Sequence, residues 1–401
     1  MRKAIVLATD KNYLEKTLVT IKSISVYNRD IDFYIFHQGD VPVEWIRVVN
    51  KRLVHLGSSL KHIFISDERV NAFHSFLPSS SWLRLFIPQY VAESKALYLD
   101  SDIIVNGSLD TLFAIDLEDK MLAAVEDPNM NEAGNFNSGV LLLNLDLWRR
   151  KGLTNILLKV AAIKSSSVRN GDQSILNLVV GNQWIPLGKQ YNYQTYDVVS
   201  RYDHRAYLYE DIGSWTPLII HFLTADKPWN EYSVARFREL WWYYASLEFS
   251  SLDGRRSQAV SFEEALDALT GPSKHAFLLT ETDQLEHIDY LVSNLPDIQF
   301  HIAAYTMVSS RLKSLMNYDN VQVYPEIIDA RVDKLLDYCD IYLDINHYSE
   351  VKGIVSKARE KGKLILTFEN TVHHPELASE IFSPKNPEKF LEYLQAMLMI
   401  Q

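Results

Sequence analysis

Lys95-Ala-Leu-Tyr-Leu-Asp-Ser-Asp-Ile-Ile-Val105 is an apolar stretch interrupted by two carboxylates, Asp100 and Asp102. The apolar part predicts a buried strand, and side chains two residues apart on an extended backbone point the same way. Hard oxygen ligands so placed suit Mg²⁺ or Mn²⁺, which are often held by one or two carboxylates plus substrate phosphates. The pattern predicts a metal site. Its alternative is a turn-capping carboxylate beside a solvated one, because Asp favours turns.

Short apolar runs alternate with amphipathic segments on both sides of this stretch. Expected strands are 4–9, 32–36, 62–65, 96–99, 121–126, 139–145 and 217–221, and expected helices are 15–27, 42–56, 146–164, 172–180 and 233–248. This alternation indicates βαβ units and a mostly parallel sheet, in which ligands bind beyond the carboxyl ends of the strands. Asp10 also follows a strand, so we expect it to face the same crevice as Asp100 and Asp102.

A polar, turn-prone segment at 250–258 indicates a domain boundary. We therefore expect a first domain over residues 1–250 and a smaller α/β domain over 259–401. The second domain has its own expected strands at 275–279, 298–304, 321–323, 340–343 and 363–367, and helices at 285–294, 308–316, 330–336, 348–361 and 387–399.

Composition excludes several classes of protein. The 401 residues carry a net charge of −11, which argues against a nucleic acid partner. A single cysteine, Cys339, excludes an internal disulfide framework and a cysteine-based zinc site, and fits a reducing, cytoplasmic compartment. No run is long and apolar enough for a transmembrane helix. The aromatic run Trp241-Trp242-Tyr243-Tyr244 leaves open a peripheral membrane contact or a helix packed between domains.

Five further side chains stand out, each with a structural alternative. His221 follows a strand and suits a divalent metal, or is a structural histidine. Lys227 suits a phosphate, or is a surface charge. Asn137 precedes Ser138-Gly139 and suits sugar hydroxyls, or forms a turn. Asp172 is a ligand or a helix cap, and Arg84, expected at the start of a helix, is by itself an ion-pair partner.

The order of these motifs resembles glycosyltransferase family 8, the family of glycogenin and the lipopolysaccharide galactosyltransferases. The resemblance covers residues 1–250 and rests on Leu7-Ala-Thr-Asp-Lys-Asn-Tyr13, Arg84, Tyr98-Leu-Asp-Ser-Asp102, Asn137-Ser-Gly139, Asp172-Gln173 and His221…Lys227-Pro-Trp229. It implies a GT-A (Rossmann-like) fold, a UDP-hexose donor and Mn²⁺, with Mg²⁺ as the alternative ion.

The resemblance also assigns roles to residues. The implied metal ligands are Asp100, Asp102 and His221. The implied uridine and ribose contacts are Asp10, Asn12 and Tyr13. Arg84 and Lys227 match the diphosphate cations, and Asn137, Asp172 and Gln173 match donor-sugar positions. Asp127 matches the family's aspartate after the strand that follows the metal motif. Glu126 takes that place if the match is shifted by one residue.

One position departs from the family pattern: Thr224 stands where a glycine near the diphosphate is usual, and its side chain narrows that approach. The tail resembles the C-terminal half of glycosyltransferases that modify serine-rich bacterial adhesins, through 298–304 and 338–347. It implies a Rossmann-like accessory domain for acceptor or partner binding. Asp344 and His347 suggest a second active site, but a strand end with a solvated histidine is the preferred interpretation.

The predicted activity is a retaining transfer of glucose or galactose from a UDP-sugar to a glycan acceptor, such as the growing O-glycan of a serine-rich adhesin. Same-face attack is favoured because Gln173 is a poor nucleophile, with Asp127 as the fallback nucleophile. The alternatives are a lipopolysaccharide or cell-surface glycan hexosyltransferase and a non-catalytic carbohydrate-binding assembly protein. A nucleotidyltransferase would want a glycine-rich N-terminal loop, and residues 9–13 contain no glycine.

Overall fold

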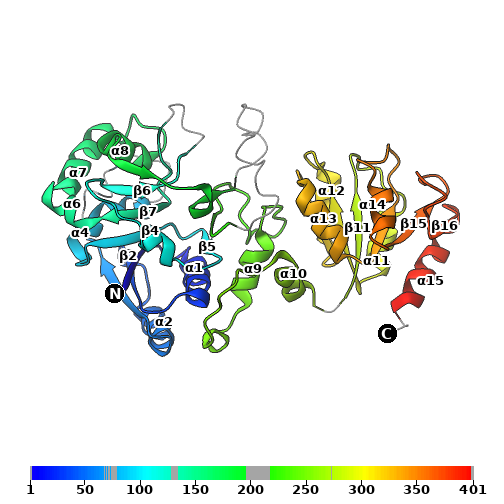
Figure 1. The fold of residues 1–401 in the computed structure, drawn as a ribbon, viewed down its shortest axis with the longest axis horizontal. Coiled ribbons are helices and arrows are strands. Elements are labelled where there is room, and N and C mark those ends of the chain that lie inside the picture. Colours follow the sequence, from blue (N-terminus) through cyan, green and yellow to red (C-terminus); the bar gives the residue numbers. More distant parts are fainter. Residues whose placement is uncertain are drawn as a thin grey trace. The chain divides into compact units, whose positions relative to one another are not determined.

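A computed structural model describes residues 2–66, 68, 70, 73, 79–127, 134–195, 217–271 and 273–398 (Figure 1). The chain forms two units. The first comprises residues 1–196, 216–225 and 240–260, and the second comprises 197–215, 226–239 and 261–401. Residues 226–239 thus belong to the second unit although they precede part of the first along the chain.

A seven-stranded sheet forms the centre of the first unit, in the order β3-β2-β1-β4-β7-β6-β8. Its strands are β1 (Lys3–Ala8), β2 (Ile31–His37), β3 (Ser59–Phe64), β4 (Lys95–Leu99), β6 (Leu122–Ala124), β7 (Val140–Asn144) and β8 (Trp184–Pro186). The first four in this order pair in parallel, β7 is antiparallel to both β4 and β6, and β8 is parallel to β6. The insertion of β7 between β4 and β6 brings residue 139 beside the end of β4.

Helices cover both faces of this sheet (Figure 1). Along β1, Ile5 and Leu7 face the core formed with α1 (Leu14–Tyr27) and α2 (Val43–His55), while Ala4 and Val6 face the opposite core. That opposite core contains the apolar residues of α6, α7 and α8. This is the alternation expected of a strand buried on both faces.

Further helical elements of the first unit are η1 (Ser79–Phe86), α4 (Ile87–Tyr90), α5 (Asp110–Phe113), α6 (Leu145–Arg150), α7 (Leu153–Lys164), α8 (Gly171–Val180), η2 (Lys189–Tyr191) and η5 (Phe249–Leu252). The helix α9 (Arg238–Ser246) begins in residues of the second unit and continues in the first. A separate three-stranded sheet has the order β5-β10-β9, with β5 (Ile103–Val105), β9 (Tyr193–Gln194) and β10 (Ile219–His221).

The second unit contains a fully parallel six-stranded sheet in the order β13-β12-β11-β14-β15-β16. Its strands are β11 (Lys274–Leu279), β12 (Ile298–Ala303), β13 (Val321–Tyr324), β14 (Ile341–Asp344), β15 (Leu364–Phe368) and β16 (Glu380–Phe382). Its helices are α10 (Phe262–Thr270), α11 (Ile288–Asn294), α12 (Ser310–Ser314), η6 (Leu315–Asn317), α13 (Asp329–Tyr338), α14 (Ile354–Glu360) and α15 (Pro387–Leu398). Cores of α11, α12 and α15 on one face and α10, α13 and α14 on the other enclose the sheet.

Several helices and strands begin or end at other residues than predicted. The single helix expected over 146–164 is two helices, because the chain turns at Gly152, whose φ is +60°. The N-cap of α6 is Asn144, whose side chain accepts from the Leu147 amide at 3.1 Å. Asp146, where the expected helix begins, lies in the first turn. The expected helices at 233 and 348 begin later, at Arg238 and Ile354. The short strands β5, β8 and β16 and the helix α10 were not predicted.

Candidate functional site

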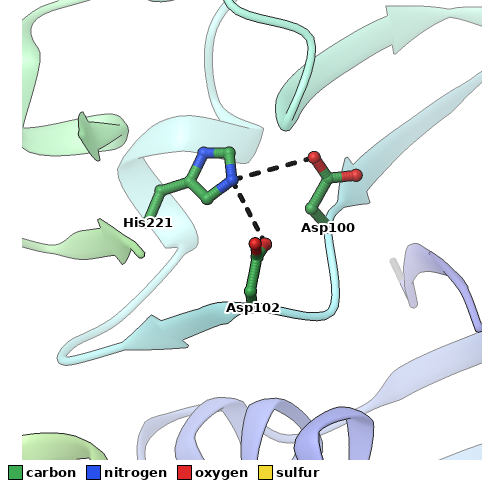
Figure 2. Close-up of side chains that lie close together, drawn as sticks. All are labelled: Asp100, Asp102 and His221. Carbon is green, nitrogen blue, oxygen red and sulfur yellow. Dashed lines mark ion pairs between the residues drawn. The ribbon is translucent and has the colours of Figure 1, made fainter. Parts of the chain in front are cut away.

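Asp100 and Asp102 lie on the turn that joins β4 to β5 (Figure 2). The amide of Asp100 donates to the Gly139 carbonyl at 2.9 Å, and the amide of Phe222 donates to the Asp102 carbonyl at 3.0 Å. Ser101, between them, turns toward β1 and donates to the Ala8 carbonyl at 2.8 Å. The two carboxylates share one side as expected, but a turn rather than a continuous strand places them there.

His221 completes a cluster of three potential metal ligands (Figure 2). It ends β10, whose antiparallel register sets it opposite Ile103 on β5, one residue after Asp102. Its Nε2 lies 3.2 Å from Asp102 Oδ1 and 3.8 Å from Asp100 Oδ2. Two carboxylate oxygens and one imidazole nitrogen on converging side chains form a donor set suited to a divalent cation. The predicted ligands therefore converge, and their chemistry fits the ion.

Arg84 lies in the last turn of η1, a 3₁₀ helix, and not at the start of a helix as expected. Its Nη2 donates to Asp100 Oδ1 at 2.9 Å, which also accepts from the Tyr98 hydroxyl at 2.7 Å, and Nη1 donates to the Ser138 hydroxyl at 3.0 Å. Burial opposes the charge of Arg84, but Asp100 and Asp172 outweigh it and raise the pKa of the guanidinium. Arg84 thus holds Asp100 with Oδ2 toward His221.

Asp172 lies in the first turn of α8, where Asn170 takes the N-cap position. The side chain is buried, with Oδ2 3.0 Å from Arg84 Nε. Burial raises the pKa of this carboxyl to about 6, with Arg84 lowering it and Asp100 raising it. The interpretation of Asp172 as the helix cap is therefore wrong; it is a buried carboxylate paired with Arg84.

Gln173, Asn137 and Asp127 form one hydrogen-bonded chain beside the cluster. Gln173 Oε1 accepts from the Ser138 amide at 3.0 Å and from Asn137 Nδ2 at 3.3 Å, and Gln173 Nε2 donates to Asp127 Oδ2 at 2.7 Å. The carbonyl oxygen of Gln173 is thus bonded to the protein, and its amide nitrogen points to Asp127. Glu126, the neighbouring residue, is exposed and accepts from the Gly134 amide at 3.2 Å.

Asn192 is a site residue that the motifs did not reveal. It is 1% exposed, donates through Nδ2 to Asn137 Oδ1 at 2.9 Å, and lies with Oδ1 3.2 Å from His221 Nδ1. It precedes β9, which pairs in parallel with β10 and so with the strand that carries His221. Its only signal in the sequence is its place in the Tyr- and Asn-rich segment 190–209, whose part from 196 to 209 lies outside the described residues.

The predicted uridine contacts follow β1, the strand next to β4. Asp10 Oδ1 accepts from the Asn12 amide at 2.8 Å, and the Tyr13 amide donates to the Asp10 carbonyl at 3.1 Å. Burial raises the pKa of the Tyr13 hydroxyl, and Asp102 raises it further, followed by Asp10 and Asp100. Asp10, Asp100 and Asp102 all act on the same hydroxyl, as expected if these three carboxylates face one crevice.

Each of the two units contains one of the two remaining positions, Thr224 and Lys227. Thr224 belongs to the first unit, with His221, whereas Lys227 belongs to the second.

The aromatic run 241–244 lies in α9. There, Tyr244 is buried and its hydroxyl lies 2.9 Å from that of Tyr27, while Trp242 is exposed. Among the described residues, no helix is both long and apolar enough to cross a membrane.

Asp344 and His347 of the second unit have separate partners. Asp344 ends β14, is buried, and accepts from His373 at its amide (2.9 Å) and its Nδ1 (2.5 Å). His373 Nε2 lies 2.6 Å from the Tyr348 carbonyl, and His347 Nε2 lies 2.6 Å from Glu286 Oε2. His373 thus bonds to the carboxylate at the end of β14, and His347 bonds to Glu286.

Comparison with known proteins agrees with this architecture. Residues 4–233 match the model of glycosyl transferase family 8, and residues 276–401 match that of the GftB/GlyA-F C-terminal domain. Glycosyltransferase GlyB of Streptococcus pneumoniae serotype 4 (strain ATCC BAA-334 / TIGR4) is 40% identical over 405 residues, covering 99% of both chains.

Two solved structures share the fold. The crystal structure of glycosyltransferase GlyE from Streptococcus pneumoniae TIGR4 has a TM-score of 0.57 and 31% identity, covering 99% of each chain. The galactosyltransferase LgtC, solved with donor and acceptor sugar analogues, has a TM-score of 0.53 and 25% identity, covering 60% of this chain and 95% of its own. The predicted GT-A fold with a second α/β domain is thereby confirmed. The chain is a glycosyltransferase and belongs to glycosyl transferase family 8.

Proposed function

We propose that this protein is a retaining, metal-dependent hexosyltransferase that moves glucose or galactose from a UDP-sugar to a glycan acceptor. The observation that carries the proposal is the convergence of Asp100, Asp102 and His221, from two segments about 120 residues apart, into one donor set. Mn²⁺ is the proposed ion, with Mg²⁺ as the alternative. When bound there, the ion supplies Lewis-acid stabilisation of the charge that develops on the departing UDP.

Residues behind the ligands hold them in place before substrate arrives. Arg84 and Tyr98 both donate to Asp100 Oδ1, which directs Oδ2 toward His221. Such pre-organisation lowers the reorganisation needed at the moment of reaction. In this proposal Arg84 acts mainly by fixing Asp100 and Asp172, because its donors already bond to the protein. Asp172 then accepts from a hydroxyl of the donor sugar.

The orientation of Gln173 supports same-face attack. Its carbonyl oxygen accepts from Ser138 and Asn137, so it does not serve as a nucleophile toward the anomeric carbon. Its amide nitrogen holds Asp127, the fallback nucleophile. We propose that the bond from the anomeric carbon to the diphosphate breaks while the acceptor oxygen bonds on the same face. The acceptor proton passes to the leaving phosphate oxygen.

The remaining donor contacts keep their proposed roles. Asp10, Asn12 and Tyr13 bind uridine and ribose, Asn137 binds the sugar, and Lys227 places a positive charge on the diphosphate. The position of Tyr13 among the carboxylates of Asp10, Asp100 and Asp102 supports the first of these. The single cysteine supports a reducing, cytoplasmic location.

The second unit is proposed to bind the acceptor, and the acceptor is proposed to be the O-glycan of a serine-rich adhesin. Support comes from the match of residues 276–401 to the GftB/GlyA-F C-terminal domain. Tyr348, which is 64% exposed, follows β14 at the carboxyl end of the parallel sheet, where such sheets bind ligands. Tyr348→Ala is expected to keep donor hydrolysis and lose transfer to a glycopeptide. Unchanged transfer would remove Tyr348 from the acceptor site.

Donor hydrolysis tests the central proposal. UDP-glucose, UDP-galactose and their N-acetyl forms are each incubated with the protein, with Mn²⁺ and with chelator. We expect release of UDP from one hexose donor, dependent on the metal and absent in Asp102→Ala. Asp119→Ala, which removes an exposed carboxylate of the same unit, is the matched control and should behave as the wild type.

Two outcomes separate the rival functions. Metal-independent glycan binding without hydrolysis of any donor would favour the non-catalytic carbohydrate-binding protein. Hydrolysis followed by transfer to a lipopolysaccharide or another cell-surface glycan, and not to a glycopeptide, would favour a hexosyltransferase that builds lipopolysaccharide or cell-surface glycans.

A further inference from the structure

A chain of two buried asparagines connects a backbone amide to the metal-facing histidine. The Gly139 amide donates to Asn137 Oδ1 at 3.0 Å, Asn192 Nδ2 donates to the same oxygen at 2.9 Å, and Asn192 Oδ1 lies 3.2 Å from His221 Nδ1. Asn137, Asn192 and His221 are each less than 5% exposed. The contacts are therefore shielded from water, and the direction of each hydrogen bond matters.

The direction of the chain is set by groups that cannot reverse their polarity. A backbone N–H can only donate, so the Gly139 amide requires an oxygen from Asn137 at that point. The other end of the Asn137 amide then presents Nδ2 to Gln173 Oε1, which the Ser138 amide fixes in the same way. Reversal of Asn137 would place its nitrogen against the Gly139 N–H and its oxygen against Gln173 Oε1. Two independent backbone donors thus specify one orientation.

The fixed orientation of Asn137 determines that of Asn192. Because Asn137 Oδ1 accepts, Asn192 presents Nδ2 to it and Oδ1 to His221. An amide oxygen can only accept, so His221 must carry its proton on Nδ1. The lone pair of Nε2 then faces Asp100 Oδ2 and Asp102 Oδ1. An unprotonated nitrogen facing two carboxylates is an arrangement that a cation stabilises.

We propose that Asn192 is a positioning residue that selects the metal-binding tautomer of His221, an inference that rests on the proposed metal-dependent function. The competing tautomer carries the proton on Nε2 and donates it to Asp102 across the 3.2 Å contact, which would block the metal. Partners of this kind orient a metal-ligating histidine, and their loss typically lowers metal affinity about 10- to 100-fold.

Three variants test the role of Asn192. Asn192→Ala removes the acceptor at His221 Nδ1. Asn192→Asp keeps an acceptor there but cannot donate to Asn137. Thr195→Val is the matched control, because the buried Thr195 hydroxyl donates to the backbone carbonyl of His221, at 3.2 Å. A general sensitivity of the site to loss of any buried hydrogen bond near His221 would make the control as damaging as Asn192→Ala.

The first measurement is the ¹⁵N spectrum of the histidine rings in metal-free full-length protein at alkaline pH, where histidine rings are neutral. The His221 signals, assigned by comparison with His221→Gln, are expected to show the Nδ1–H tautomer in the wild type, in Asn192→Asp and in Thr195→Val. Asn192→Ala is expected to shift toward Nε2–H. An Nε2–H tautomer in the folded wild type, or no change in Asn192→Ala, would overturn the proposal.

The second measurement is Mn²⁺ affinity in the presence of UDP, from the electron paramagnetic resonance signal of free Mn²⁺. We expect affinity to fall about 10- to 100-fold in Asn192→Ala and to remain close to wild type in Asn192→Asp and Thr195→Val. Failure of the wild type to bind Mn²⁺, with the Nδ1–H tautomer intact, would refute the metal-dependent function instead. Equal affinity of wild type and Asn192→Ala would refute the role of Asn192.

Discussion

Replacing Gly139 by alanine tests the geometry of the site with a single methyl group. Gly139 directly precedes β7 beside the ligands, and a Cβ built there would lie 2.1 Å from His221 Cε1, 2.7 Å from His221 Nδ1 and 2.8 Å from Asp100 Oδ2. Its backbone is not in the left-handed region, so alanine meets no conformational barrier. Any effect of Gly139→Ala therefore comes from contact with the two ligands.

The size of the effect follows from these distances. Ordinary contact begins near 3.4 Å, so the His221 ring or the β7 backbone must move by about 1 Å. Asn192 holds one side of the ring, and β7 is paired to β4 and β6, so neither moves without cost. We expect a loss of about 1–3 kcal/mol in stability. Misplacement on this scale can lower turnover about 100-fold.

The assay compares Gly139→Ala with Gly254→Ala. Gly254 also has a non-left-handed backbone, but a Cβ there would meet no atom within 4 Å. Donor hydrolysis, Mn²⁺ binding with UDP and thermal unfolding are measured for both proteins. Gly254→Ala should match the wild type in all three. Wild-type Mn²⁺ affinity and hydrolysis in Gly139→Ala would refute the proposed contact of residue 139 with the metal ligands.

Three further changes probe other parts of the structure. Asp102→Ala should abolish Mn²⁺-dependent donor hydrolysis, because it removes a ligand, while the protein still folds. Arg84→Ala leaves the carboxylates of Asp100 and Asp172 without their buried cation and should lower the free energy of unfolding by about 3–5 kcal/mol, measured by urea denaturation. Burial holds the pKa of His301, in β12, well below its usual range, so it stays neutral in the folded protein. The unfolded chain takes up that proton below about pH 6.5, and stability should fall as pH falls, by up to about 1.4 kcal/mol per unit, with a shallower slope in His301→Gln. Hydrogen exchange of β12 amides between about pH 5 and 7, corrected for intrinsic rates, measures this slope.

Each of these expectations has an opposing result. Metal-dependent turnover in Asp102→Ala would show that the ion binds elsewhere. An unfolding free energy for Arg84→Ala within about 1 kcal/mol of wild type would mean that solvent reaches both carboxylates. The same pH slope in wild type and His301→Gln would assign the acid sensitivity to other groups, with His275 the first candidate because burial also lowers its pKa.

Local pattern was enough to predict most of the fold. Short apolar runs located the strands β1, β2, β4 and β7, and amphipathic segments located the main helices that cover them. Prediction failed where a few residues decide a boundary. Asn144 rather than Asp146 caps α6 because its side chain reaches the Leu147 amide, and Gly152 ends one helix and begins the next. The strand β5 is three residues long, too short for a periodicity signal.

The motifs of the sequence alone determined the family and the chemical types present: two carboxylates, an imidazole, and buried amide and guanidinium groups in a characteristic order. Only the tertiary structure decided which atoms meet. The antiparallel insertion of β7 sets Gly139 against Asp100 and His221, and the pairing of β9 with β10 sets Asn192 beside His221, 29 residues away in the chain. No local spacing encodes such contacts, because strand order and register depend on how distant segments bury their apolar faces.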